Sequence, residues 1–263
     1  MIAIFDSGLG GLTAVKELRS RFPDAQYIYF GDTGRVPYGT RSRGTIIKYA
    51  LQDMRFLLSV RSDISAVLVA CGTVSSTALD VLRANFNVPV FGVVESAAGT
   101  AVKATKNRHV AVIATTATVN SGAYEREIKK LDTGIKVTAA ACPLFVPLVE
   151  NGFTGGDEVT RLVCERYLRE VRESGADTCI LGCTHYPLIA DEIARSLPGV
   201  TLIDTGAEAV NAIAPHYYAP DTDANIPPSY YVSDDPEGFT RFASKLFGDG
   251  WHGAAELVDI EKY

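Results

Sequence analysis

Two cysteines of this chain stand where buried strands are predicted to end. The segment CILGCTHYP, residues 179–187, is an apolar run that stops at Cys183, and the run AVLVA, residues 66–70, stops in the same way at Cys71. A thiol at the end of a strand can donate a proton, and its thiolate can accept one or act as a nucleophile or metal ligand. We expect a helix N-terminus just beyond each cysteine, which would favour the thiolate, as a protonated His185 would at Cys183. Two such thiols facing one another across a cleft could form a disulfide, bind a metal ion or flank a substrate carbon from opposite faces.

The cysteine count and spacing indicate neither a disulfide framework nor a zinc site. Five cysteines are an odd number without framework spacing, and a chain of 263 residues needs no disulfides to build a core, so we expect free thiols in a reducing compartment. Cys179, Cys183 and His185 could suggest zinc, but four residues of straight strand place the two cysteines roughly 13 Å apart. We therefore predict no metal site. The remaining cysteines are expected to pack in the core: Cys142, Cys164 and Cys179.

The glycine-rich segment DSGLGGLT, residues 6–13, is a second candidate binding feature. A dinucleotide fingerprint that starts at Gly8 requires glycine at position 13, where the chain has Thr13, and no phosphate-binding lysine follows. The glycines favour instead a tight turn whose backbone N–H groups and helix N-terminus accept a small anion such as a carboxylate.

Short apolar runs separated by segments of helical spacing indicate the fold that positions these residues. Continuous apolar strands that alternate with helices predict parallel sheets covered on both faces, and in such sheets ligands bind at the carboxyl ends of the strands. Helices are expected, for example, at residues 12–22 and 75–86. The predicted strands are residues 2–5, 26–30, 66–70, 88–94, 110–114, 136–142, 178–182 and 200–204.

Internal similarity predicts two halves built on one plan. The unit IAIFDSGLGGLTAVKEL resembles VAVIATTATVNSGAYEREI, which places Thr115 level with Asp6, 109 positions later. The segment ISAVLVACGTVSSTALDVL also resembles DTCILGCTHYPLIADEIA, which pairs Cys71 with Cys183 at a separation of 112. We therefore expect an α/β fold of two pseudo-symmetric domains, each a mainly parallel sheet flanked by helices, with the active site in the cleft between them.

The C-terminal segment is expected to return to the first half. Its predicted elements are a helix at 207–218, a Pro/Asp-rich surface connection at 221–229, a short strand at 229–234 and a terminal helix at 236–248. The resulting division is a discontinuous first domain, residues 1–95 plus 207–263, and a second domain, residues 96–206, both of ordinary size.

Composition excludes several classes of partner. The net charge is −6, and no cluster of Lys and Arg could neutralise a row of phosphates, so we expect no nucleic-acid partner. No stretch approaches 18 apolar residues and the N-terminal segment lacks the features of a signal peptide, which predicts a cytoplasmic protein without a membrane partner.

Several motifs together resemble the glutamate racemases of the aspartate/glutamate racemase family. The likeness runs over nearly the whole chain, in the same order and spacing, and its most specific parts are LGCTHYPLI and the segment ending in RVPYG. It implies an isomerase that converts L-glutamate to D-glutamate for peptidoglycan synthesis, with glutamate as its small-molecule partner and no cofactor, and it leaves a homodimer open. The matching segments are DSGLGGLTAVKEL, YFGDTGRVPYG, ACGTVSSTAL, SGAYEREI, PLFVPLVENG and LGCTHYPLI.

The resemblance also assigns roles to residues. Cys71 and Cys183 match the two catalytic acid/base thiols, with Cys71 taking the proton from D-glutamate and Cys183 from L-glutamate. The polar residues that match their assistants are Asp6, Glu150 and His185. The positions that match substrate contacts are Asp6, Ser7, Pro37, Tyr38, Gly39, Gly72, Thr73, Thr115, Thr118 and Thr184.

The chain departs from the family pattern at one of these positions. The family usually has Cys-Asn-Thr where this chain has Cys71-Gly72-Thr73, so a side-chain amide expected to contact the substrate is absent. A lost hydrogen bond costs on the order of 1 to 3 kcal/mol if its partner is left unpaired, and less if water replaces it. The substitution therefore bears on substrate choice and turnover rather than on the fold.

The implied reaction makes physical demands that these residues could meet. Without a cofactor, the protein itself must stabilise a carbanion conjugated with the substrate carboxylate, and backbone N–H groups and hydroxyls in a closed cleft can do so. The two thiols must also hold opposite protonation states, which Asp6, Glu150 and His185 could set.

Other functions stay open on sequence grounds. Gly72 motivates a racemase of aspartate or another acidic amino acid. A non-catalytic protein that binds a small carboxylate on the same scaffold is a second alternative. A redox protein that uses Cys71 and Cys183 as a thiol switch is a third.

Overall fold

The computed structural model describes residues 1–216 and 226–263, which form two parallel sheets flanked by helices. The first sheet has the strand order β10-β9-β2-β1-β3-β4, and every adjacent pair is parallel. Its strands are β1 (Ile2–Asp6), β2 (Tyr27–Gly31), β3 (Ala66–Val69), β4 (Val90–Gly92), β9 (Ser229–Val232) and β10 (Ala255–Leu257).

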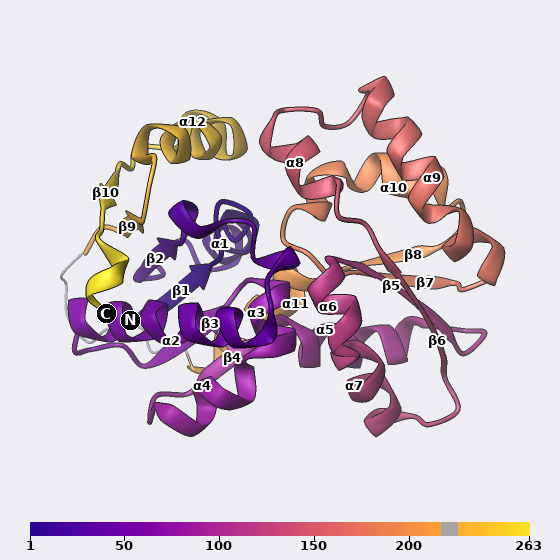
Figure 1. Ribbon diagram of the computed structural model, residues 1–263, viewed down its shortest axis with the longest axis horizontal. Coiled ribbons are helices and arrows are strands. Elements are labelled where there is room, and N and C mark those ends of the chain that lie inside the picture. Colours follow the sequence, from indigo (N-terminus) through magenta and orange to yellow (C-terminus); the bar gives the residue numbers. More distant parts are fainter. Residues whose placement is uncertain (217–225) are drawn as a thin grey trace.

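The second sheet repeats the central part of this arrangement. Its order is β6-β5-β7-β8, again parallel throughout, so β5 and β7 lie side by side as β1 and β3 do. Its strands are β5 (His109–Ala114), β6 (Lys136–Ala141), β7 (Thr178–Leu181) and β8 (Thr201–Asp204). The predicted fold class, with one mainly parallel sheet in each half, is confirmed, and Figure 1 shows the two halves side by side.

Helices alternate with the strands in both halves. They are α1 (Leu12–Arg21), α2 (Arg43–Val60), α3 (Gly72–Thr77), α4 (Leu79–Asn85), α5 (Val93–Ala104), α6 (Thr116–Ser121), α7 (Ala123–Leu131), α8 (Phe145–Glu150), α9 (Glu158–Ser174), α10 (Ala190–Ser196), α11 (Thr205–Ile213) and α12 (Pro236–Phe247). Short 3₁₀ helices cover Thr33–Arg35, Tyr38–Thr40, Tyr186–Ile189, Ala214–His216, Gly248–Gly250 and Ile260–Lys262.

A shared core holds the halves together. One cluster of buried hydrophobic residues includes Ile4 of β1 and Leu68 of β3 as well as Val112 of β5 and Ile180 of β7. Helices α5 and α11 pack against one another (Figure 1), and α5 also contacts β7 and β8 of the second sheet. Burial of apolar surface therefore fixes how the two sets of strand ends face each other.

The C-terminal segment returns to the first sheet as expected, because β9 pairs with β2 and β10 pairs with β9. The predicted boundaries at 95/96 and 206/207 fall within α5 and α11. We propose the division into residues 1–95 plus 207–263 and residues 96–206 with these two packed helices as its connection. The predicted surface connection at 221–229 lies outside the described residues as far as residue 225, as does the end of the predicted helix at 207–218.

Some predicted elements differ from the structure. The apolar run 88–94 forms a strand only over Val90–Gly92, because Val93 and Val94 already begin α5. The helix predicted at 75–86 starts earlier, at Gly72, and is interrupted at Ala78 between α3 and α4. An apolar run does not distinguish the end of a buried strand from the start of a buried helix.

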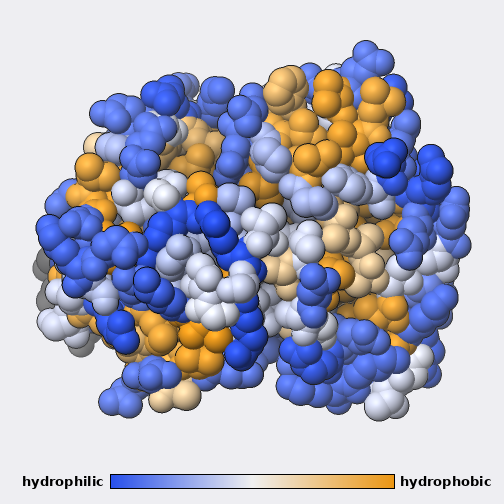
Figure 2. Space-filling view, in the orientation of Figure 1, coloured by the Kyte–Doolittle hydropathy of each residue, from blue (hydrophilic) through white to orange (hydrophobic). Residues whose placement is uncertain are grey.

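The surface carries mixed polarity. Exposed hydrophobic side chains occur near α8 and the start of α9, where Figure 2 shows a hydrophobic area: Leu144, Phe153, Val159 and Leu162. Among the described residues, no helix has the length and apolar character needed to cross a membrane.

Candidate active site

A cavity of about 260 Å³ lies where the strand ends of the two sheets meet. Cys71 reaches it from the end of β3, and Cys183 from the end of β7 in the other half. The predicted residues that line it are Ser7, Pro37, Tyr38, Gly39, Cys71, Gly72, Thr73, Thr115, Glu150, Cys183, Thr184 and His185. The structure therefore brings both thiols and most of the predicted substrate contacts into one cavity.

The surroundings of Cys71 favour its neutral thiol form. It caps α3, is only 4% exposed, and its Sγ donates to Ser7 Oγ over 3.3 Å. Burial, and then the nearby Asp6 carboxylate, raise the pKa of Cys71 to about 12, although the hydrogen bonds that a thiolate would accept from Ser7 and the Val74 backbone act in the opposite direction. At neutral pH this sulfur therefore carries its proton and can serve as an acid.

Cys183 has a cationic neighbour instead. Its Sγ lies 3.8 Å from His185 Nδ1, and His185 Nε2 lies 3.0 Å from Glu150 Oε1. Burial disfavours the imidazolium, but the contacts with Cys183 and Glu150 outweigh it and raise the pKa of His185 to about 10. A protonated His185 therefore places a positive charge directly beside this sulfur.

The helix N-terminus expected just beyond each cysteine is present only for Cys71. Helix α3 begins directly after Cys71, at Gly72. Cys183 is followed by the 3₁₀ helix Tyr186–Ile189 rather than by an α-helix, so the expected second helix dipole is wrong. The charge beside Cys183 therefore comes from His185 rather than from the backbone.

Asp6 stands one layer behind the cavity wall. It is fully buried at the end of β1, where Oδ2 accepts from the Gly8 N–H over 2.9 Å and Oδ1 accepts weakly from Thr184 Oγ1 over 3.4 Å. Burial raises the pKa of Asp6, while His185 lowers it. Asp6 is not among the residues that line the cavity, so the structure places it next to the predicted contacts rather than in them.

Three threonine hydroxyls at and behind the cavity wall form a hydrogen-bonded chain between the two halves. Thr73 Oγ1 and Thr115 Oγ1 are 3.0 Å apart, and Thr115 Oγ1 is 3.0 Å from Thr118 Oγ1. Thr118 is buried and does not line the cavity, unlike Thr73 and Thr115. Thr118 therefore supports Thr115, whose side chain also caps α6.

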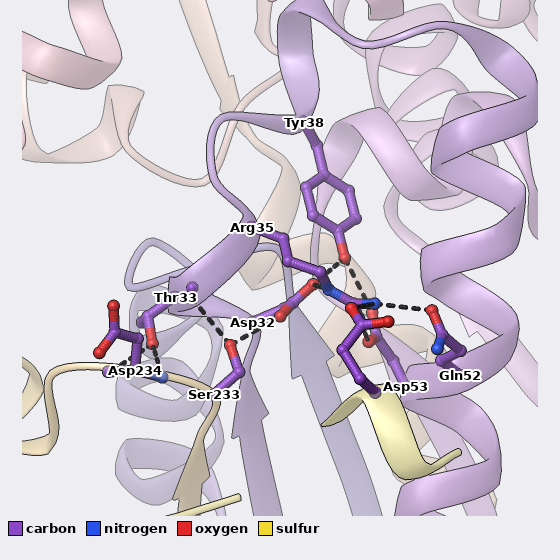
Figure 3. Close-up of polar contacts among 10 residues, drawn as sticks. Asp32, Thr33, Arg35, Tyr38, Gln52, Asp53, Ser233 and Asp234 are labelled. Atoms are coloured by element: carbon purple, nitrogen blue, oxygen red, sulfur yellow. Dashed lines mark hydrogen bonds and ion pairs between the residues drawn. The ribbon is translucent and has the colours of Figure 1, made fainter. Parts of the chain in front are cut away.

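The segment Val36–Thr40 forms another wall. Pro37, Tyr38 and Gly39 all line the cavity. The Tyr38 hydroxyl, however, points into a polar cluster formed with Asp32 and Arg35 (Figure 3). Gly39 lies against Thr115 of the other half, and a Cβ atom on it would sit 2.8 Å from the Thr115 Cβ.

Gly72 is a point of close approach between the halves. A Cβ atom there would lie 2.3 Å from the carbonyl oxygen of Gly182 and 3.7 Å from the Cys183 Cα. The backbone that delivers Cys183 therefore occupies the space that any larger side chain at position 72 would need. The glycine at this position thus allows the two halves to pack closely, and it also leaves the chain without the side-chain amide of the family pattern.

Several lining residues were not predicted. Three of them, Pro143, Val146 and Pro147, come from the start of α8 and the turn before it and give the cavity an apolar side. The rest are Gly8, Val36, Thr40 and Thr116. The motif PLFVPLVENG covers this region, but only Glu150 was predicted from it as a site residue, because the types of its apolar residues do not indicate a chemical role.

The other three cysteines are free and buried, as predicted. They pack in the core of the second half. Within residues 1–216 and 226–263, no group of three or more His, Cys, Asp or Glu side chains is arranged to hold a metal ion.

Comparisons with known proteins agree on one family. The model of the Asp/Glu/Hydantoin racemase family matches residues 13–213. The chain is 42% identical over 265 residues to a glutamate racemase of Geobacter metallireducens, covering 99% of this chain and 97% of that protein. It is 50% identical over 204 residues to a glutamate racemase of Aquifex pyrophilus, covering 78% of each. Its structure is similar to that of the glutamate racemase of Francisella tularensis in complex with D-glutamate, with a TM-score of 0.90, 36% identity, and coverage of 100% of this chain and 98% of that one.

Proposed function

The chain belongs to the Asp/Glu/Hydantoin racemase family, and we propose that it interconverts L- and D-glutamate with Cys71 and Cys183 as its two acid/base groups. The predicted enzyme class, an amino-acid racemase acting on glutamate, is confirmed by relatives that match nearly the full chain. The observation that supports the two-thiol assignment is the cavity between the halves, which is lined by Cys71 from the first half and by Cys183 from the second.

The first step is removal of the α-proton of L-glutamate. The Cys183 thiolate takes the proton, the C–H bond breaks, and its electron pair stays on the α-carbon in conjugation with the carboxylate. His185 supports the thiolate form of Cys183, and Glu150 orients His185 through the contact at Nε2. Glu150 and His185 thus prepare the base.

The second step delivers a proton to the opposite face. The Cys71 thiol gives its proton to the α-carbon, which yields D-glutamate and leaves a thiolate at Cys71 and a thiol at Cys183. The same steps in reverse convert D-glutamate to L-glutamate. Between turnovers in one direction the two sulfurs must return to their starting protonation states through exchange with solvent.

The charge that develops between these steps needs donors around the substrate carboxylates. We propose that hydroxyls and backbone N–H groups on the cavity wall supply them. Donors are available from both halves: Ser7, Gly39 and Thr73 in the first, Thr115 and Thr184 in the second. The apolar side formed by Pro143, Val146 and Pro147 limits water next to the reacting carbon.

Asp6 and Thr118 have supporting parts in this proposal. The negative charge of Asp6 behind Cys71 disfavours a thiolate at Cys71 in the free enzyme. Asp6 also accepts a hydrogen bond from the Thr184 hydroxyl. Thr118 holds the side chain of Thr115. Neither residue needs to touch the substrate for these effects.

The reaction is tested by following optical activity with purified protein. L-glutamate and D-glutamate should each lose optical activity until the mixture is racemic, whereas L-aspartate should react far more slowly. No change with either glutamate enantiomer would reject the proposed function, and faster reaction of aspartate would assign the chain to another acidic substrate. Binding of glutamate without any exchange of the α-proton would indicate a carboxylate-binding protein.

Three further proposals accompany this function. A cytoplasmic location follows from the sequence features described above, and a supply of D-glutamate for peptidoglycan and the absence of a cofactor follow from the family likeness. Activity of extensively dialysed protein in the presence of a chelator tests the last of them. The homodimer also stays a prediction, which sedimentation analysis of the purified protein can test.

A further inference from the structure

A buried polar cluster lies beneath the segment that carries Tyr38, outside the cavity (Figure 3). Asp32 follows β2, and Asp53 comes from the middle of α2. Both carboxylates are fully buried, and Arg35 between them is 9% exposed. Two buried carboxylates beside one guanidinium are an unusual arrangement, because an uncompensated buried charge is costly.

Arg35 connects the cluster. Its Nε donates to Asp32 Oδ2 over 2.6 Å, its Nη2 to Asp53 Oδ1 over 2.9 Å, and its Nη1 to Gln52 Oε1 over 2.7 Å. The guanidinium also lies 4.1 Å from the ring centre of Tyr49. The guanidinium thus donates to acceptors within the cluster and packs one of its faces on the Tyr49 ring. These contacts hold its single positive charge in place.

The Tyr38 hydroxyl contacts both carboxylates but has only one hydrogen to donate. It forms a very short hydrogen bond to Asp32 Oδ2, and it lies 3.3 Å from Asp53 Oδ2. Asp32 also accepts from Ser233 Oγ over 2.7 Å, so its oxygens act as acceptors throughout. Because the hydrogen of Tyr38 is used in the bond to Asp32, the contact between Tyr38 and Asp53 is a second hydrogen bond only if Asp53 donates.

The charge balance points the same way. One guanidinium can neutralise one buried carboxylate, so the buried part of the cluster is neutral only if one of the two carboxyl groups keeps its proton. Burial, and then the neighbouring Asp32, raise the pKa of Asp53 well above its usual value. Glu261 contributes a third carboxylate 3.4 Å from Arg35, but its side chain is 62% exposed and solvent screens it.

We propose that Asp53 is a protonated carboxylic acid in the folded protein and that the hydrogen-bonded chain Asp53–Tyr38–Asp32 fixes the cavity wall at residues 37–40. This inference rests on the proposed function. Tyr38 lines the cavity while its hydroxyl is held in the cluster, and the next residue, Gly39, lies against Thr115 of the other half. The cluster thus sets where one wall of the cavity stands. Asp32, Arg35 and Asp53 are positioning residues, because none of them lines the cavity.

The matched pair D53N and D53A tests the role of the proton. An asparagine at position 53 can donate its amide to Tyr38 and accept from Arg35, as the protonated acid does, whereas alanine can do neither. We expect D53N to keep kcat/KM within about threefold of the unsubstituted protein, and D53A to lose on the order of 100-fold. The loss should appear largely in KM, because a wall that binds the substrate does so before and during the reaction.

The variant D32N gives the opposite expectation. Both oxygens of Asp32 act as acceptors, so an amide there places a donor against the groups that donate to it and should cost on the order of 100-fold in kcat/KM. An account in which the cluster serves only folding predicts instead that all three variants change activity in proportion to their loss of stability. Equal impairment of D53N and D32N would overturn the assignment of the proton to Asp53.

A measurement without substrate separates this inference from the proposed function. If Asp53 keeps a proton that it loses on unfolding, its stabilising effect is complete below about pH 4 and is lost as the pH rises through its folded-state pKa. The ratio of the unfolding constants of the unsubstituted protein and D53N should therefore rise up to tenfold per pH unit above about pH 4. The charged or titratable groups near Asp53 are Asp32, Arg35, Tyr38 and Glu261, and they are common to both proteins. Parallel pH dependence in the two proteins would overturn the inference even if racemisation is observed.

Discussion

Cys71 and Cys183 follow equivalent strands in the two halves, β3 and β7, yet their surroundings differ in charge. Cys71 donates to a neutral hydroxyl, that of Ser7, and has the buried Asp6 carboxylate behind it. Cys183 has His185, whose pKa is raised to about 10, and Glu150 beyond it. Repetition of a βα unit thus brings a thiol to the cavity from each half, and we propose that the residues that differ between the copies set opposite protonation states.

This difference has a consequence for direction. We propose that the free protein takes the proton from L-glutamate at Cys183 and returns one from Cys71. Because L- and D-glutamate have equal free energies, kcat/KM must nevertheless be the same in both directions for any variant. The asymmetry between the two sulfurs is therefore visible only in kcat, KM and isotope exchange.

The largest expected effect is the loss of either thiol. The variants C71A and C183A should each lower racemisation by about 10² to 10⁴-fold in both directions, because each removes a positioned proton-transfer group. Initial rates of optical rotation measure this loss. The control is C164A, which shortens a buried core cysteine and should keep its activity. Full activity of either site variant would show that its sulfur is not required.

Removal of the cation beside Cys183 comes next. H185Q keeps a side chain that can bond to Glu150 but cannot carry a positive charge, and should lower kcat/KM by about 10- to 100-fold, since an adjacent charge shifts a protonation equilibrium by this order. Steady-state kinetics with both enantiomers check the effect. A change below twofold would mean that the thiolate form of Cys183 has another source.

The same residue predicts a pH effect. The pKa of His185 is raised to about 10. The contribution of the protonated imidazole to the free energy of unfolding is therefore complete below the ordinary histidine pKa of about 6.5 and is lost as the pH rises through about 10. The activity should fall over the upper part of that range, where Cys71, with a pKa of about 12, still holds its proton. A pH profile of kcat/KM for the unsubstituted protein and H185Q tests this. The step should be absent from H185Q, and its persistence there would assign it to another group.

Gly72 lies at a close contact between the two halves, and we expect its substitution to have a smaller effect. A methyl group at position 72 would meet the Gly182 carbonyl at 2.3 Å, so G72A must displace the loop that carries Cys183. Overpacking of this kind costs about 1 to 3 kcal/mol in the free energy of unfolding, and we expect about a tenfold loss of kcat. The matched control is G44A, where a methyl group would meet nothing within 4 Å. Activity of G72A equal to that of G44A would show that the contact does not position Cys183.

The smallest expected effect is at Ser7. S7A removes a neutral acceptor from the Cys71 thiol, which is worth about 1 kcal/mol or about fivefold in rate. Kinetics of S7A and H185Q under the same conditions compare the two halves directly. A larger loss for S7A than for H185Q would reverse the proposed asymmetry.

Much of this arrangement could be predicted from the sequence. Strands rich in Val and Ile, and the repeat that relates Cys71 to Cys183, indicated two parallel sheets with thiols at equivalent ends. The short strand β10 was not predicted, because three residues next to a glycine-rich segment give no periodic signal. The interruption at Ala78 was also missed, since alanine is compatible with a continuous helix.

The limits at the site have a similar physical cause. Asp6 and Thr118 were predicted as substrate contacts from the resemblance to the family. Neither lines the cavity, because the layer that a side chain occupies depends on the turn that follows each strand. The cluster of Asp32, Arg35 and Asp53 was missed altogether. Charged residues in a sequence usually indicate surface, and only the fold brings these three together away from solvent.

Hydrogen exchange at the α-carbon tests the central claim most directly. In deuterated water, C71A retains only the base that serves L-glutamate, and C183A only the base that serves D-glutamate. We predict that C71A labels L-glutamate alone and C183A labels D-glutamate alone, both without racemisation, as followed by mass spectrometry after separation of the enantiomers. Labelling of the opposite enantiomer by either variant, or of both enantiomers by one, would contradict the account.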